Sequence, residues 1–162
     1  MTEQTFPDFG ALLGPFIAQV PSDAIPRFLA LLERGAAQRY REWSHEIPEH
    51  VEVLLACSIR EDDIASRVER VWPIDDSVRE QLDAALPAAR DMYYSIFIGL
   101  SPWEQLAIQA NAELQGAAAW RGLAMSQTDV VIIDELERCA QLEEESSREL
   151  IRIITRRVGR SE

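Results

Sequence analysis

The chain has 162 residues, of which 47% are apolar and 27% charged, a length and composition typical of one globular domain with a hydrophobic core. Its 28 acidic residues outnumber 16 basic residues, all of them arginine, and the net charge of −12 argues against sequence-independent binding of nucleic acid. No apolar run approaches the roughly 20 residues that span a bilayer, the N-terminus lacks a secretory pattern, and two cysteines make no disulfide framework, so we expect a cytoplasmic, reduced protein.

Apolar residues recur at helical spacing along the whole chain, and the strict alternation of half-buried strands is nearly absent. The pattern predicts a short N-terminal segment over residues 9–19. A first long helix is expected over residues 22–45, with Ser22 or Asp23 as its N-cap. A second is expected over residues 48–72, with a proline in its first turn. The first half of the chain therefore predicts an all-α fold.

Three further helices are predicted, over residues 76–98, 101–125 and 129–158. Pro87 lies inside the first of these and predicts a break or kink there. Ser101, the proline that follows it and Glu104 have the form of an N-cap, an N1 proline and a capping box. No linker divides the chain, which favours a single all-helical domain over residues 1–162. Its parts would be an N-terminal segment (1–21), a first helical hairpin (22–72), a crossover (73–100) and a second helical hairpin (101–158).

One glutamate in each of four long predicted helices falls in line with apolar residues rather than on the solvent face. These residues are Glu33, Glu61, Glu113 and Glu143. Glu33, for example, follows Leu29 by four positions and precedes Ala36 by three, which places all three side chains on one helix face. A buried and unpaired carboxylate is costly, so each of the four must be protonated, paired with arginine or bound to a metal.

The four glutamates also lie at matched depths. Residues equidistant from the turn of an antiparallel hairpin share a level, and the midpoint of Glu33 and Glu61 is residue 47, in the first predicted turn. The midpoint of Glu113 and Glu143 is residue 128, in the second predicted turn. The two hairpins resemble each other as well, which indicates a weak internal repeat. It aligns Glu33 with Glu113, Tyr40 with Trp120, Arg41 with Arg121, Cys57 with Cys139 and Glu61 with Glu143.

Two helical hairpins that carry inward glutamates and are joined by a long crossover resemble the ferritin-like carboxylate proteins, in the style of rubrerythrin or bacterioferritin. The resemblance covers about residues 22–157. It implies an antiparallel four-helix bundle in which Glu33, Glu61, Glu113 and Glu143 would hold iron or manganese. It also implies an oxidase or a metal-handling protein, with dioxygen or peroxide as the co-substrate.

The sequence departs from this family at two positions. The second and fourth bundle helices of the family read Glu-x-x-His, whereas Ile64 follows Glu61 here and Ser146 follows Glu143. The only histidines, His45 and His50, flank the first predicted turn and are expected to be exposed. A site made of carboxylates alone would suit hard divalent metals such as manganese or magnesium.

A metal-free helical bundle that acts as a dimeric interaction module is the alternative. Arginines would then pair with the inward glutamates, and the candidates are Arg41, Arg60, Arg67, Arg121 and Arg148. A homodimer or another protein partner would use apolar residues of the crossover, namely Tyr93, Tyr94, Ile96, Phe97 and Ile98. The N-terminal segment would cap the bundle or dock on a partner chain.

Cys57 and Cys139 each precede an inward glutamate by one helical turn. They could be soft metal ligands or a redox pair, although buried free cysteine more often packs as a small hydrophobic residue.

Overall fold

The computed structural model describes residues 5–159, and these residues form six α-helices, two short 3-10 helices and no strand. The all-α prediction is therefore confirmed. The α-helices are α1 (Phe9–Ile17), α2 (Ile25–Glu46), α3 (Val51–Val71), α4 (Asp76–Ser95), α5 (Pro102–Met125) and α6 (Val130–Val158). The 3-10 helices are η1 (Ser22–Ala24) and η2 (Pro48–His50). No helix within the described part of the chain is both long and apolar enough to cross a membrane.

Side-chain caps fix the starts of most of the helices. The predicted capping box of α5 is confirmed, because the Ser101 hydroxyl accepts from the Glu104 amide and the Glu104 carboxylate accepts from the Ser101 amide. Asp129 accepts from the second amide of α6, and Asp75 caps α4 in the same manner. Asp8 does so for α1. These short-range signals explain why the helices begin where the sequence predicts them.

Three predictions about these helices are wrong. The second long helix begins at Val51 rather than Pro48, because residues 48–50 form the 3-10 turn η2. The first long helix begins at Ile25 rather than Ser22 or Asp23, because residues 22–24 form the 3-10 turn η1 and Pro26 fits only the first turn of an α-helix. The predicted break at Pro87 is absent as well, and α4 runs through Pro87 and ends at Ser95. Pro87 lies on the exposed face of α4, where water can solvate the carbonyl that loses its hydrogen bond.

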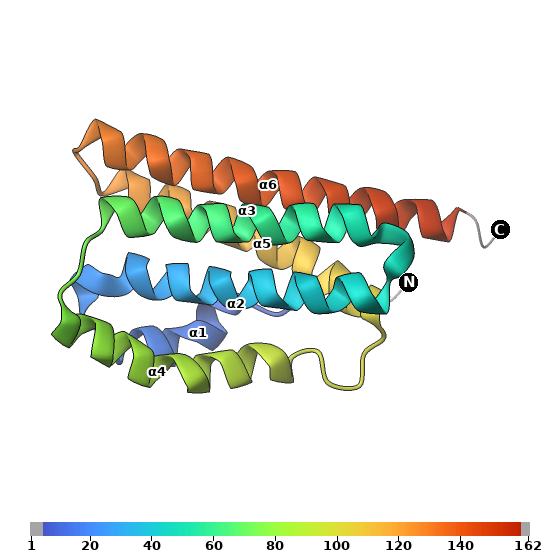
Figure 1. The fold of residues 1–162 in the computed structure, drawn as a ribbon, viewed down its shortest axis with the longest axis horizontal. Helices are drawn as coiled ribbons and strands as arrows, with labels where there is room; N and C mark the ends of the chain where they lie inside the picture. The colour runs from blue at the N-terminus through green and yellow to red at the C-terminus, as the bar shows by residue number, and fades with distance from the viewer. Residues whose placement is uncertain (1–4, 160–162) are drawn as a thin grey trace.

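The long helices pack as two hairpins. α2 packs along α3, α5 packs along α6, and α3 and α6 join the two pairs. In Figure 1, α6 and α3 lie side by side, α2 lies beneath α3, and α4 runs along the outer side of α2. The short α1 contacts α4 and α5. α2 and α5 do not pack along each other as α3 and α6 do. α1 and α4 close that side of the bundle instead.

The apolar core divides into two clusters at the level of the inward glutamates. One cluster includes Ala30, Ile64, Val68, Ala117, Trp120, Leu136 and Cys139. The other includes Tyr40, Trp43, Leu54, Cys57, Leu106, Ala110 and Leu150. Along each of the four long helices, the glutamate separates the members of one cluster from those of the other. A polar layer therefore crosses the middle of the core.

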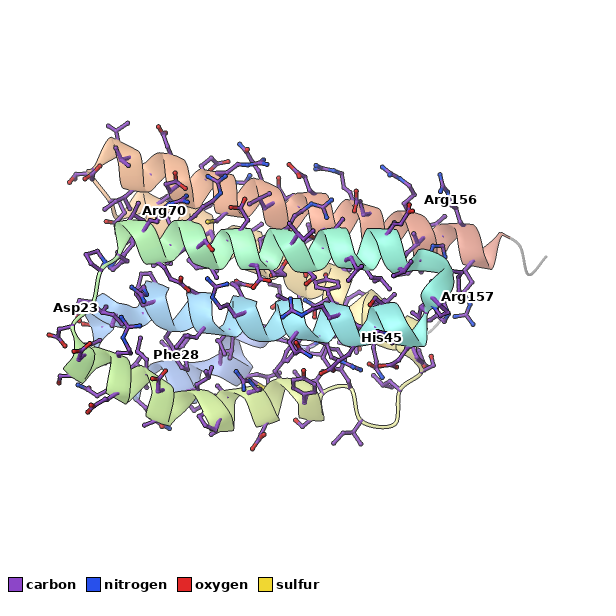
Figure 2. The ribbon with its side chains drawn as sticks, in the orientation of Figure 1. Asp23, Phe28, His45, Arg70, Arg156 and Arg157 are labelled. Atoms are coloured by element: carbon purple, nitrogen blue, oxygen red, sulfur yellow. The ribbon has the colours of Figure 1, made fainter. Side chains whose placement is uncertain are left out.

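A third apolar cluster joins α2 to α4. Phe28 is fully buried there and points from α2 toward α4 (Figure 2). Leu82 and Ala89 of α4 pack against it. His45 lies at the far end of α2, near the α2–α3 connection, and is exposed as the sequence predicts. The third cluster fixes α4 beside the hairpin of α2 and α3. The histidines lie at the α2–α3 connection of that hairpin, away from the polar layer.

Candidate metal centre

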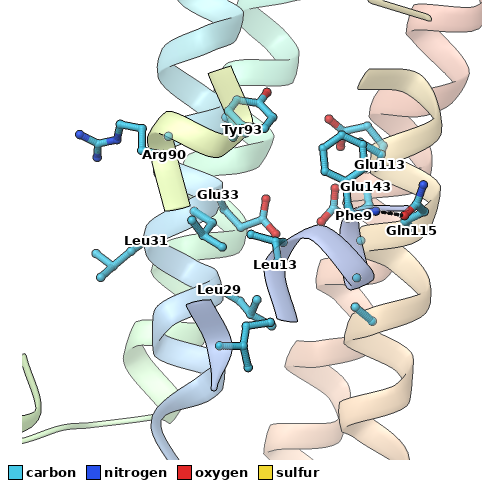
Figure 3. Close-up of a pocket in the computed structure, with 18 of the residues that line it drawn as sticks. Phe9, Leu13, Leu29, Leu31, Glu33, Arg90, Tyr93, Glu113, Gln115 and Glu143 are labelled. Carbon is cyan, nitrogen blue, oxygen red and sulfur yellow. Dashed lines mark hydrogen bonds between the residues drawn. The ribbon is translucent and has the colours of Figure 1, made fainter. Parts of the chain in front are cut away.

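Three of the four predicted ligands meet in the polar layer. Glu33 of α2, Glu61 of α3 and Glu143 of α6 each offer a carboxylate oxygen, and these oxygens lie within 4.8 Å of one another. Glu61 and Glu143 are buried, whereas Glu33 is half-buried because it faces a cavity. Figure 3 shows Glu33 and Glu143 pointing toward each other across this space. Oxygens at this separation can bind one cation together.

Glu113 of α5 lies at the edge of this cluster. The Tyr40 hydroxyl donates to its Oε1 at 2.5 Å, and the Gln109 amide donates to the same oxygen at 2.7 Å. The Glu113 carboxyl is also within hydrogen-bonding reach of Glu143. All four glutamates therefore belong to one network, although only three of them converge closely.

Burial and mutual repulsion favour the protonated forms of these carboxyls. Burial raises the pKa of Glu33 from 4.5 to about 7, and its contacts with Glu61 and Glu143 oppose part of that increase. The pKa values of Glu61 and Glu143 lie well above the ordinary value because both groups are buried among other carboxylates. Without a cation, the layer must hold protons at neutral pH.

Arginine does not neutralise the layer, because the candidate partners bind other carboxylates. Arg41 pairs with Asp62, Arg60 with Glu149, Arg67 with Glu135 and Arg121 with Glu137, at 2.9–3.1 Å. Together with Arg121, the charge of Arg148 helps to lower the pKa of the Glu144 carboxyl. These long side chains extend to the surface, where their charges stay hydrated. The arginine pairing that the sequence left open is therefore not what the structure shows for these five residues.

Several carboxylate oxygens in the layer have no donor. Within residues 5–159, both oxygens of Glu61 and Oε2 of Glu113 are fully buried and receive no hydrogen bond. Buried polar atoms in proteins are normally satisfied, so orphaned carboxylate oxygens that face one another call for protons or a cation. The donor set is made of oxygen atoms only, which suits hard divalent cations.

The two positions that carry histidine in the resembled family contribute no ligand here. Ile64 is fully buried in an apolar cluster. Ser146 is also buried, and its hydroxyl accepts from Arg60 at 3.4 Å. His50 stacks edge-on against Trp103, away from the layer. No imidazole is therefore available to the cluster.

Glycine and tryptophan on α5 place the Glu143 carboxylate. A Cβ atom at Gly116 would lie 2.5 Å from Glu143 Oε1, so the glycine provides the space that the carboxylate occupies. The Trp120 indole donates to the same oxygen at 3.0 Å. The sequence pattern did not single out Gly116 or Gln109. The available signal was a glycine inside a helix, one turn after an inward glutamate.

A cavity of about 230 Å³ opens onto the layer between α1, α2, α4 and α5. Glu33, Glu113 and Glu143 form its polar end (Figure 3). Small residues of α2 and α5 leave the space open, namely Gly35, Ala36, Ala112, Gly116 and Ala119. The N-terminal segment covers the side of the bundle, the first of its two expected positions, since Phe9 and Leu13 of α1 lie across the cavity.

Cys57 and Cys139 are free and buried, and they lie in different apolar clusters. Burial raises the pKa of each thiol to about 12. Both therefore pack as small apolar side chains.

Four of the five crossover residues expected to be exposed are not exposed. Phe97 is buried and packs edge-on against Trp43, because the chain folds back over the end of the bundle. Tyr93, Tyr94 and Ile96 are half-buried. Only Ile98, at 80% exposure, presents an apolar side chain to solvent.

No protein-family model matches this chain, and neither the curated proteins nor the solved structures gave a match. The geometry of the carboxylate layer thus carries the functional argument. Three helices bring carboxylates to one point and a fourth places Glu113 at its edge, neutral donors orient Glu113 and Glu143, and a cavity reaches Glu33, Glu113 and Glu143. Such an arrangement can bind a cation and exchange protons with a molecule in the cavity.

Proposed function

We propose that α2, α3, α5 and α6 form a divergent ferritin-like four-helix bundle that binds divalent metal through Glu33, Glu61, Glu113 and Glu143. The observation that carries the proposal is the Glu61 carboxylate, which is fully buried with neither oxygen receiving a hydrogen bond. It faces Glu33 and Glu143 within the 4.8 Å cluster. A cation at that point would satisfy all three groups and offset their repulsion.

The ligand set favours manganese or magnesium, because every donor is a carboxylate oxygen. Iron is the other candidate, by the resemblance to the ferritin-like proteins. A manganese or iron ion would supply Lewis-acid and redox chemistry to a molecule in the adjoining cavity. A metal next to this cavity would suit an oxidase or a metal-handling protein.

The surrounding residues would have distinct roles. Tyr40 and Gln109 hold the Glu113 carboxylate, and Trp120 holds that of Glu143, so these two ligands are oriented in advance. Glu33 faces the cavity and has a pKa of about 7 in the metal-free protein, so it would release its proton when a cation binds near neutral pH.

Metal titration of the full chain tests the proposal. Protein purified without chelators should bind Mn²⁺ in calorimetry and give the electron paramagnetic resonance spectrum of an immobilised ion. Removing an orienting partner of a metal ligand costs about 10–100-fold in affinity, so loss of a ligand charge in Glu61→Gln should cost at least about a hundredfold.

Glu52→Gln is the matched control, because Glu52 lies on the exposed face of the same helix. It should leave Mn²⁺ binding unchanged. Absence of Mn²⁺, Fe²⁺ and Mg²⁺ binding by the folded wild-type protein would overturn the proposal, and so would equal affinities of Glu61→Gln and the wild type.

A further inference from the structure

The cavity beside the carboxylate layer has the chemistry of a small-molecule site. Its walls are apolar over most of their surface and include Leu13, Ile17, Leu29 and Leu32. Its inner end carries the carboxyl groups of Glu33, Glu113 and Glu143. Apolar cavities with a few convergent polar groups are the usual form of ligand pockets. This cavity would therefore bury an apolar body and place one polar group against the glutamates.

The cavity is built into the helices rather than left by loose packing. Gly35 and Ala36 of α2 and Ala112, Gly116 and Ala119 of α5 line it. A Cβ atom at Gly35 would approach only the Arg90 side chain, at 4.0 Å, so no neighbour has closed in on the missing side chain. The small residues of two separate helices keep this space open.

α1 closes the cavity and is tied down at its start. The Phe9 amide donates to Gln115 Oε1 at 2.9 Å, while the Gln115 amide donates to the Pro7 carbonyl at 2.8 Å. The Phe9 ring contacts Tyr93 of α4, with ring centres 6.5 Å apart. Figure 3 shows α1 passing in front of Glu33 and Glu143. A ligand would thus be enclosed by α1 on one side and the carboxylate layer on the other.

Size and charge narrow the ligand class. A cavity of 150 Å³ accepts benzene, so 230 Å³ corresponds to roughly nine non-hydrogen atoms. The carboxylates of the layer and the net charge of −12 would repel an anionic head group. An ammonium group would compete with the proposed metal for the same carboxylates, so a head group compatible with the metal-bound layer is neutral. A neutral hydroxyl can donate to a carboxylate oxygen or bind a cation held by the layer.

We propose that this cavity binds a neutral medium-chain aliphatic molecule, with its hydroxyl against Glu33 and its chain beneath α1. If this molecule is the substrate of the metal centre, the inference rests on the proposed function. Binding in the cavity itself requires no metal, which allows the two to be tested separately. 1-Octanol, with nine non-hydrogen atoms, is the probe that matches the cavity.

Calorimetry and nuclear magnetic resonance titrations of metal-free protein should show one 1-octanol site with a sub-millimolar Kd and much weaker binding of octanoate. Gly35→Leu fills the cavity from α2 and should weaken 1-octanol binding at least about tenfold while Mn²⁺ binding persists. Gly122→Leu is the matched control, because a Cβ atom at Gly122 of α5 would meet nothing within 4 Å and the residue lies outside the cavity.

Glu61→Gln separates the two proposals, since Glu61 does not line the cavity. It should abolish Mn²⁺ binding and leave 1-octanol binding intact, which would support the cavity site independently of the metal. If Gly35→Leu fails to fold, Ala112→Phe fills the same space from α5. Absence of 1-octanol binding by folded wild-type protein would overturn the inference, as would unchanged 1-octanol binding in a folded cavity-filling variant.

Discussion

The hairpin of α2 and α3 and the hairpin of α5 and α6 each supply two glutamates to one layer, but they hold them differently. Both glutamates of the second hairpin accept hydrogen bonds from neutral donors, as Tyr40 and Gln109 bind Glu113 and Trp120 binds Glu143. In the first hairpin, Glu61 receives none within the described residues, and Glu33 lines the cavity together with Glu113 and Glu143. The second hairpin is therefore the oriented half of the layer, in which neutral donors hold both glutamates. The first hairpin is the free half, in which Glu61 has no donor.

The internal repeat explains how this difference arises. Tyr40 and Trp120 occupy equivalent positions in the two hairpins, and both donate to glutamates of the second hairpin. Trp120 bonds within its own hairpin, whereas Tyr40 reaches across to Glu113. Residues at equivalent positions of the repeat therefore have different hydrogen-bond acceptors. The repeat sets the depth of each carboxylate in the bundle but not which side chain donates to it.

The largest expected effect concerns Glu33, the proton-exchanging member of the free half. Its pKa in the folded protein, about 7, exceeds the ordinary value of 4.5, so protonation stabilises the metal-free fold. The contribution of Glu33 to the free energy of unfolding should be complete below pH 4.5 and should be lost, by about 3 kcal/mol, as the pH rises through 7. Urea unfolding at pH 5 and pH 8 measures the fall.

Glu33→Gln should remove only the Glu33 part of this pH dependence, because the raised pKa values of Glu61 and Glu143 leave a fall of the same sign. Glu144→Gln is the control, because Arg121 lowers the pKa of the Glu144 carboxyl and places its titration below this range. A wild-type protein whose stability rises between pH 5 and pH 8 without metal would contradict the prediction.

Replacement of Glu61 by an apolar residue of similar volume tests the contrast between the halves directly. Glu61→Leu should stabilise the metal-free protein by about 2 kcal/mol, because a buried carboxyl without a donor is replaced by good packing. Glu143→Leu should bring no such gain, because it leaves the Trp120 indole without its acceptor, at a cost of about 1–3 kcal/mol. Equal shifts of the urea midpoint for the two variants would show that the two halves of the layer do not differ in how they hold their glutamates.

The smallest expected effect comes from Gly116→Ala in the oriented half. The added methyl group would lie 2.5 Å from Glu143 Oε1 and should displace that carboxylate. Mn²⁺ affinity should fall about tenfold while the helix itself gains up to about 1 kcal/mol in propensity. Gly122→Ala adds the same methyl group into open space and should leave the affinity unchanged. If both variants bind Mn²⁺ equally, Gly116 does not place the ligand.

Much of the fold could be predicted because its signals are local. Helical spacing identifies the helices, and the capping box at Ser101 and the N-cap at Asp129 fix two of their starts. The inward direction of Glu61 follows from the same spacing. Its depth relative to Glu33 follows from the position of the turn, since an antiparallel pair leaves little freedom of register.

The surroundings of the layer could not be predicted, because they depend on which elements meet in space. Arg41 and Arg121 lie close to the glutamates in sequence, yet their long side chains reach surface carboxylates instead. The burial of Phe97 depends on how the chain folds back over Trp43. The cavity requires α1 to lie across a gap between α2 and α5, and no periodicity encodes that placement.

The division of the core into two apolar clusters has a consequence for how the molecule opens. Cys139 belongs to the cluster on one side of the carboxylate layer and Cys57 to the cluster on the other. With pKa values of about 12, neither thiol reacts at neutral pH while its own side stays closed. Each cysteine therefore reports the opening of its own end of the bundle. The order in which Cys57 and Cys139 react with an alkylating reagent shows which end opens first.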